Sequence, residues 1–174
     1  MSMTIPLPFH TLRPSLIVVL AASMVLAAGA LPLSAQDAVL SDNERALALE
    51  AQAEHYLEEA SRADRAADLY QRAAELRSDA DPRKVENLQM AARLSFHAGE
   101  GRRAMEMQAA AALLATRQGD VIQASHAWLD AAWVAAEVGE PQRAKEYMVE
   151  ARLLATSPLL AESDRNAIRA RIVS

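Results

Sequence analysis

The sequence contains an internal repeat, and this repeat constrains the fold more than any other feature. Residues 88–116 align with residues 128–156 at an offset of 40 residues without a gap, and twelve of the 29 paired positions are identical. The identical pairs include Gly99 with Gly139, and residues 113–116 with residues 153–156. A fixed period of about 20 to 50 residues is typical of stacked repeats, which mostly present surfaces to partners. The repeat therefore predicts a binding protein, without identifying its ligand.

Helix start and stop signals occur along the chain after residue 40. Ser41 and Glu44 have the spacing of a capping box, Asp81-Pro82 is typical of a helix start, and Gly119-Asp120 combines a stop with a start. No stretch alternates between apolar and polar residues as a strand would. We expect an all-α protein with helices near 42–60, 62–79, 82–98, 100–118, 120–138, 141–156 and 163–172.

Consecutive helices are expected to pair as three helix-turn-helix hairpins, near 42–79, 82–118 and 120–156. Their tight turns centre on Ser61, Gly99 and Gly139. An alanine follows each turn by five residues, and another follows by twelve; these are Ala66 and Ala73, Ala104 and Ala111, Ala144 and Ala151. Small side chains at a helix crossing let two helices approach closely. The first hairpin therefore belongs to the same series as the two obvious copies.

The third unit resembles the tetratricopeptide repeat. It has an early aromatic residue, small residues in mid-helix, a glycine at the turn and two alanines in the second helix, namely Trp128, Ala131, Ala132, Gly139, Ala144 and Ala151. The second unit matches with Leu88 in place of the tryptophan, and the first matches more weakly. The period exceeds the 34 residues of the family, as longer helices would explain. The resemblance implies a right-handed superhelix whose first helices line a concave, partner-binding face.

Transferring that groove to this sequence gives eight candidate residues on the first helices of the second and third units. They are Gln89, Arg93, Phe96, His97, His126, Leu129, Trp133 and Glu137. Aromatic residues and arginine dominate binding energy at interfaces, so Trp133, Phe96 and Arg93 form the sharpest group. The alternative is that Trp133 packs against a C-terminal helix and that Arg93 is a solvated charge.

Residues 163–172 are expected to form that C-terminal helix. Ile168 and Ile172 lie four residues apart, with arginines elsewhere around the helix. An amphipathic helix in this place would cap the last repeat by covering its apolar face.

The composition argues against several other classes of function. The chain has no cysteine and a formal net charge of −5, so thiolate metal sites, disulfides and a nucleic-acid footprint are not expected. His97 and His126 fall about eleven helical positions apart in register, too far to share a metal ion. No catalytic or phosphate-binding motif is present. We expect no enzyme activity, cofactor or metal, and a protein or peptide as the partner.

Residues 1–35 have the features of a secretory signal. Arg13 precedes an apolar run over 16–30, and Ser34-Ala35 forms a small-residue cleavage site. Cleavage would leave a repeat domain of residues 36–174, periplasmic or secreted. An uncleaved segment would instead anchor the protein in a membrane with the repeats outside the cytoplasm.

Two functions from different classes remain open at this point. One is an exported adaptor that binds a protein or peptide in the groove of its first helices. The other is a self-associating structural or assembly protein, and a membrane-anchored regulator is a third possibility. The sequence leaves the oligomeric state open.

Overall fold

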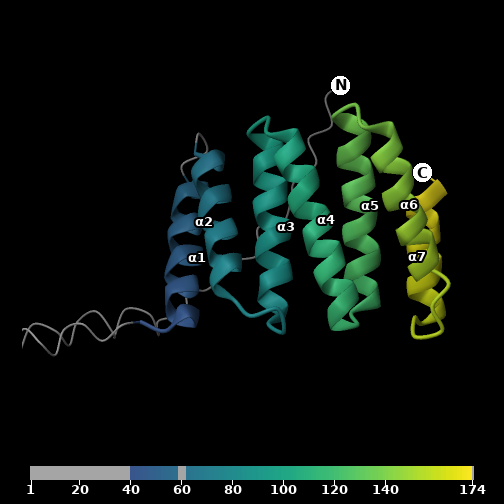
Figure 1. Cartoon of the computed structure of the whole chain (residues 1–174), viewed down its shortest axis with the longest axis horizontal. Coiled ribbons are helices and arrows are strands. Elements are labelled where there is room, and N and C mark those ends of the chain that lie inside the picture. The colour runs from purple at the N-terminus through teal and green to yellow at the C-terminus, as the bar shows by residue number, and fades with distance from the viewer. Residues whose placement is uncertain (1–39, 59–61, 174) are drawn as a thin grey trace, which may run out of the picture. The chain divides into compact units, whose positions relative to one another are not determined.

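The computed structural model describes residues 40–58 and 62–173, and these residues form helices joined by short turns (Figure 1). The helices in the described ranges are α1 (Asp42–Glu58), α2 (Ala63–Leu76), α3 (Pro82–His97), α4 (Gly101–Gln118), α5 (Val121–Glu137), α6 (Pro141–Leu154) and α7 (Glu162–Val173). The all-α class and the helical hairpins are therefore confirmed in this part of the chain. The signal-like residues 1–35 lie outside it, so their role stays a prediction.

Short polar motifs define the helix starts as the sequence predicts. The backbone N–H of Glu44 donates to Ser41 Oγ at 3.3 Å, and the backbone N–H of Ser41 donates to Glu44 Oε2 at 2.8 Å, which completes a capping box. The carboxylate of Asp81 accepts from the backbone N–H of Arg83 at 2.9 Å, and Asp120 caps α5 in a similar way. These contacts satisfy amides that the first helical turn leaves without partners.

Glycine ends α3 and α5 for a conformational reason. Gly99 and Gly139 have φ angles of 83° and 78°, in the left-handed region that side chains disfavour. In each case the next residue donates its N–H back to the helix, from Glu100 to Ser95 O and from Glu140 to Ala135 O, both at 2.8 Å. This is the hydrogen-bond pattern of a Schellman cap, so the two repeat copies end their first helices identically.

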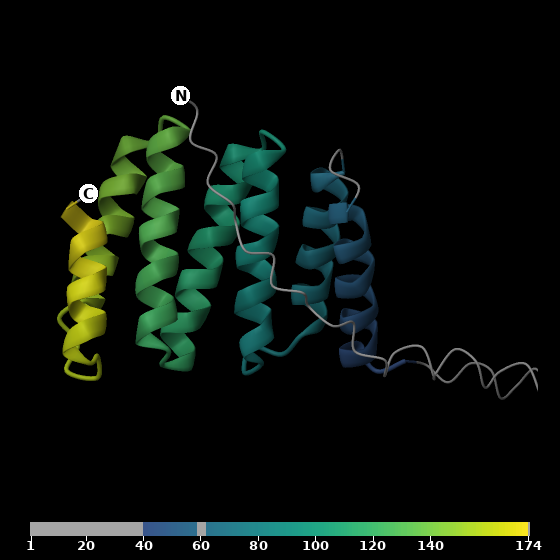
Figure 2. The ribbon, with the colours of Figure 1, turned by 180° about the vertical axis from the view of Figure 1, so that it is seen from behind.

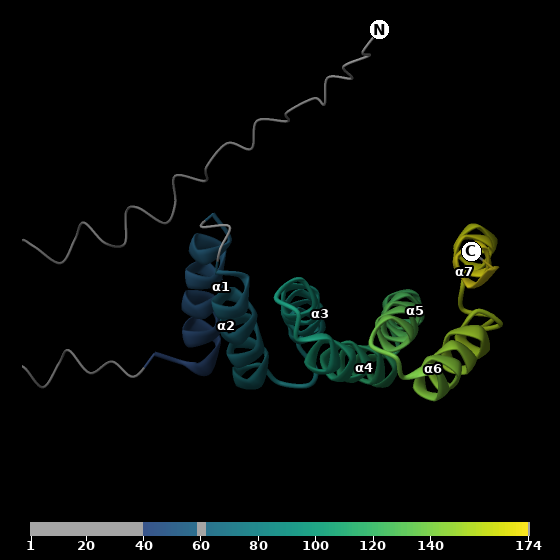
Figure 3. The same cartoon turned by 90° about the horizontal axis from the view of Figure 1, so that it is seen from above.

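The helices form two layers, and each helix from α1 to α6 packs against its neighbours in sequence. Seen from above, α3 and α5 lie in one layer and α4 and α6 in the other (Figure 3). Helices α1 and α3 line one pocket with α2 between them, as α3 and α5 do with α4, so we assign α1 to the first layer and α2 to the second. We call the outer face of the first layer the A side. Helix α7 lies on the A side at the end of the array and packs against α5 and α6 (Figure 2).

Alanines make close packing between the layers possible. Five of the six alanines that follow the turns at fixed spacing have no exposed surface, and Ala144 is half-buried. A side chain this small brings helix axes together and leaves room for a few larger residues, such as Met105 between α4 and α5. The alanine periodicity thus identifies core positions correctly.

A buried arginine explains why α2 ends at Leu76, three residues before the predicted end. Arg77 has an extended backbone, and its guanidinium donates to Glu50 Oε1 at 2.5 Å, Asn43 Oδ1 at 2.9 Å and Asp81 Oδ2 at 2.8 Å. The side chain of Arg77 is 2% exposed. Continuing the helix would change the direction of this side chain. The network ties α1 to the start of α3 and fixes how the first two hairpins meet.

Candidate functional site

Three pockets follow one another along the A side, at equivalent positions of the repeat. The first and middle pockets each lie between two first-layer helices, and the third lies between α5 and α7; in each, a side chain from the intervening second-layer helix lies at the floor. That side chain is Tyr70 in the first pocket, Gln108 in the middle pocket and Met148 in the third. Gln108 and Met148 are equivalent at the 40-residue offset, and Tyr70 lies 38 residues earlier, like its turn. The fold therefore repeats the cavity while the sequence changes its chemistry.

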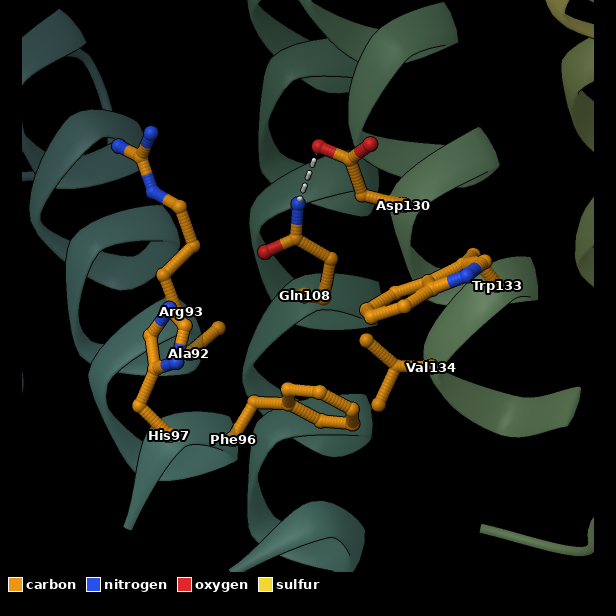
Figure 4. A pocket seen from close by; sticks show the side chains of 8 residues that line it. All are labelled: Ala92, Arg93, Phe96, His97, Gln108, Asp130, Trp133 and Val134. Carbon is orange, nitrogen blue, oxygen red and sulfur yellow. Dashed lines mark hydrogen bonds between the residues drawn. The ribbon is translucent and has the colours of Figure 1, made fainter. Parts of the chain in front are cut away.

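The middle pocket has aromatic walls and encloses about 250 Å³ between α3, α4 and α5 (Figure 4). The ring of Phe96 on α3 contacts the ring of Trp133 on α5, with their centroids 4.8 Å apart and their planes tilted by 54°. Trp133 is 53% exposed although it is one of the largest apolar side chains of the protein. Its neighbour along the helix, Trp128, packs instead against Tyr147 in the layer interior. Trp133 is thus directed to the A side, whereas Trp128 is directed to the interior.

A polar chain crosses the floor of the middle pocket. Gln108 is 2% exposed, and its Nε2 donates to Asp130 Oδ2 at 3.1 Å. The other carboxylate oxygen of Asp130 accepts from Arg171 of α7 at 2.6 Å, and Arg171 also contacts His126 Nδ1 at 2.7 Å. Because arginine can only donate, the Nδ1 of His126 is the acceptor in that contact. The last helix is therefore connected to the floor of the middle pocket through Asp130.

The first pocket is acidic. Glu50, Glu54 and Glu86 line it together with Arg83. Burial raises the pKa of Tyr70 at its floor, and the charges of Glu54 and Glu50 raise that pKa further. Glu50 is engaged by Arg77, whereas Glu54 and Glu86 make no ion pair within the described residues. The A side therefore changes from anionic beside α1 to aromatic between α3 and α5.

The third pocket is covered in part by α7. Its lining includes Met148, Arg171 and Ile172, so the capping helix supplies one wall. Trp133 lies between this pocket and the middle one and contributes to both. The sequence left two placements open for Trp133, in the groove or against the capping helix. In the structure, Trp133 lines both the middle pocket and the pocket beside α7.

Four of the eight predicted groove residues come together at the middle pocket. Arg93, Phe96, His97 and Trp133 all line it. Three others lie on the same helices but do not line it, and their role in binding stays a prediction: Gln89, His126 and Glu137.

Leu129 lines the third pocket rather than the middle one, and its role in binding stays a prediction. It is 4% exposed and packs in a cluster with Ile168 and Leu160. The reason is α7, which lies over the part of α5 that would be open in an uncapped array. The prediction treated the positions of the second and third units as equivalent, whereas the cap makes them different.

Sequence reasoning missed Gln108 and Asp130. Gln108 lies on a second-layer helix, and the resemblance directed attention to first-layer helices only. The available signal was a departure within the repeat, because a polar residue in one copy stands where the other copy has Met148. Asp130 is signalled in the same way, since its equivalent is Met90.

Comparisons with known proteins give no match to a family model, to a curated protein or to a solved structure. Within residues 40–58 and 62–173, no three metal-ligating side chains are grouped so that they could hold an ion. In the same ranges, no helix combines the length and the apolar character needed to cross a membrane.

Proposed function

We propose that this protein is an exported, non-enzymatic binding module of the tetratricopeptide-repeat type, which engages a protein or peptide partner on the A side of its hairpins. The observation that carries the proposal is the aromatic pair at the middle pocket, formed by the partly buried Phe96 and the half-exposed Trp133. Large aromatic side chains are enriched at interface hot spots, where they contribute much of the binding energy. Export rests on the signal-like residues 1–35 alone.

The size of the middle pocket favours a macromolecular partner over a free cofactor. Pockets for drug-sized ligands usually enclose roughly 300–1,000 Å³. At about 250 Å³ the middle pocket suits one large side chain of a partner. The first and third pockets continue the same face, so a peptide crossing the A side would meet several anchoring points. This is the arrangement that repeat proteins use to bind extended partners.

Site-specific photo-cross-linking tests the proposal. A photoreactive phenylalanine at position 133 should trap a partner protein in the compartment where this protein resides. The same residue at position 153, on the second-layer helix α6, is the matched control because Leu153 is also exposed, at 65%. Partner adducts from position 153 but none from position 133 would reject the A side as the binding surface.

Self-association is the second candidate function, and one observation favours it. Leu113, Val149 and Leu153 are apolar side chains of α4 and α6 that are 50%, 59% and 65% exposed. Leu113 and Leu153 are equivalent in the repeat, so the same apolar position recurs on successive second-layer helices. In the cross-linking experiment, self-association through these residues would give a covalent dimer from position 153. The adaptor function predicts no such dimer.

A further inference from the structure

We infer that the middle pocket recognises a tryptophan side chain of a peptide partner, with its indole N–H donating to Gln108 Oε1. This inference rests on the proposed function, because it names the partner group that the aromatic pair would hold. The main observation is an unpaired acceptor, because Oε1 of Gln108 is buried and has no hydrogen-bond partner within the described residues. A buried acceptor left unpaired is costly, so a partner that supplies a donor gains affinity.

The orientation of the Gln108 amide is fixed by its neighbour. The carboxylate of Asp130 has only acceptor oxygens, so the NH₂ group of Gln108 must face it, as the 3.1 Å contact shows. The carbonyl oxygen consequently points the other way, into the space between α3 and α5 (Figure 4). Arg171 holds Asp130 in place from the opposite side. The pocket floor therefore presents acceptors, and a complementary ligand must bring a donor.

Packing does not account for a glutamine at position 108. The equivalent floor position is methionine in the third unit, where Met148 packs in the same setting without a polar atom to satisfy. A methionine at position 108 would fill similar space and avoid the unpaired oxygen. The polar side chain is thus a property of the one pocket that also has two aromatic walls.

Indole fits these requirements better than the other large side chains. Its N–H is a donor only, which matches a floor that only accepts. Its two-ring surface can pack against Phe96 and Trp133 in offset or edge-on contacts. Phenylalanine has the apolar surface without the donor, and the narrow side chains of lysine and arginine lack the two-ring apolar surface that would pack against Phe96 and Trp133.

Access to Gln108 Oε1 requires movement of one side chain. The oxygen points toward the side of the pocket formed by Arg93, whose side chain is exposed (Figure 4). Arg93 makes no ion pair or hydrogen bond within the described residues, so its rotation breaks no such contact. We expect this rotation to open the way for an indole. Arg93 is then a gate for the pocket as well as part of its rim.

The test uses two blocked amino acids that differ at a single ring atom. N-acetyl-tryptophanamide and the corresponding 3-benzothienylalanine compound share the two-ring shape, but sulfur replaces the N–H in the second. Titration of the purified protein, followed by calorimetry or by NMR, should show about tenfold weaker binding for the benzothienyl compound, since one hydrogen bond to a buried acceptor is lost. Equal affinities, or no binding of the tryptophan compound, would overturn the inference.

A variant pair locates the effect. Gln108→Met copies the residue of the third unit and should reduce the tenfold preference to about onefold, whereas Gln142→Met, at an exposed glutamine of α6, should leave it unchanged. Arg93→Ala should also retain the preference, because the donor reaches Gln108 and not Arg93. Each preference is a ratio measured on one variant, so a uniform loss of stability does not alter it. A preference that survives Gln108→Met contradicts the assignment.

The inference and the proposed function can fail separately. Partner adducts from position 153 but none from position 133 would reject the A side altogether. If cross-linking at position 133 succeeds while the tryptophan compound does not bind, the A side is the interface but its anchor is another group.

Discussion

At the scale of single residues, a network of charged side chains connects the first hairpin to the second. Burial raises the pKa of Asp81, but the hydrogen bond from Arg77 and the backbone N–H of Arg83 lower it by more, so the pKa lies below its usual value. Arg77 also engages Glu50, which accepts from Asn87 of α3 at 2.7 Å. Two hairpins thus depend on one guanidinium, and removal of a partner would leave a buried charge without compensation.

The depressed pKa of Asp81 predicts a pH-dependent contribution to stability. Because folding favours the charged carboxylate, its stabilisation is present at pH values above about 4 and is lost as the pH falls through the lower folded pKa. Asp81→Asn keeps a capping oxygen but removes the charge. We expect it to lower the free energy of unfolding by about 1–2 kcal/mol at pH 7, measured by urea denaturation.

The difference between Asp81→Asn and the unaltered protein should shrink as the pH is lowered from 4 toward 2. Glu146→Gln is the control, since Glu146 of α6 is exposed and makes no ion pair within the described residues. A deficit for Asp81→Asn that is the same at pH 7 and pH 2.5 would show that charge is not its cause.

Gly101 illustrates close packing at a single residue. A Cβ built there would lie 2.3 Å from Cγ1 of Val138, far inside any allowed contact. We expect Gly101→Ala to destabilise the protein by about 1–3 kcal/mol, although alanine is otherwise the better helix former. In a Val138→Ala background the same change should be neutral or stabilising, because the obstructing methyl group is gone. Denaturant melts of the four proteins in this cycle give the coupling, and additive effects would contradict the packing argument.

At the scale of helices, the sequence predicts positions that depend on local chemistry. Capping residues and turn glycines place most helix ends within one or two residues, because each acts on amides of its own turn. The end of α2 is predicted three residues too late, since it depends on contacts of Arg77 with Asn43 and Glu50, which are 34 and 27 residues away. A local sequence pattern cannot predict a contact between residues so far apart in the chain.

The same distinction between local patterns and contacts of distant residues applies to the candidate site. The resemblance to the tetratricopeptide repeat assigns Arg93, Phe96 and Trp133 to one face, and the structure brings them together. Leu129 was assigned to that face as well, but its burial depends on where α7 docks, which spacing cannot show. Gln108 enters the pocket from the second layer, so its role depends on how two layers pack rather than on the period of one helix.

We expect the apolar face of α7 to contribute most of the free energy that keeps this helix packed on the array. Ile168 is fully buried and packs with Leu129, Ala151 and Leu160. Ile168→Ala should increase hydrogen exchange in α7 by at least tenfold, because removing such a buried side chain costs about 2–5 kcal/mol and the helix is at the end of the array. Exchange in α1 and α2 should not change.

Val173→Ala is the matched control for the cap, because Val173 is 87% exposed. If Ile168→Ala raised exchange equally in all helices, the array would unfold as one cooperative unit and α7 would not be a separable cap.

The whole repeat array combines a constant frame with a variable surface. Alanines and turn glycines recur because two layers must pack in the same way in each unit. The floor positions Tyr70, Gln108 and Met148 differ, so the three pockets are acidic, aromatic and capped in turn. A surface of this kind suits recognition of one extended partner, with a different group of the partner at each pocket.

Export is a prediction at the scale of the whole chain. If residues 1–35 act as a cleaved signal, the protein isolated from outside the cytoplasm should begin at Gln36, which N-terminal mass spectrometry of the intact product measures. A product that retains Met1 through Ala35 would favour the anchored alternative.

The central claim is that the A side is a surface for another molecule and not for a second copy of this protein. Multi-angle light scattering of the purified protein over a hundredfold range of concentration tests it most directly. We predict the mass of one chain throughout, with the same result for Trp133→Ala. A concentration-dependent oligomer that Trp133→Ala dissociates would contradict the claim, because the aromatic pair would then already be occupied by self-association.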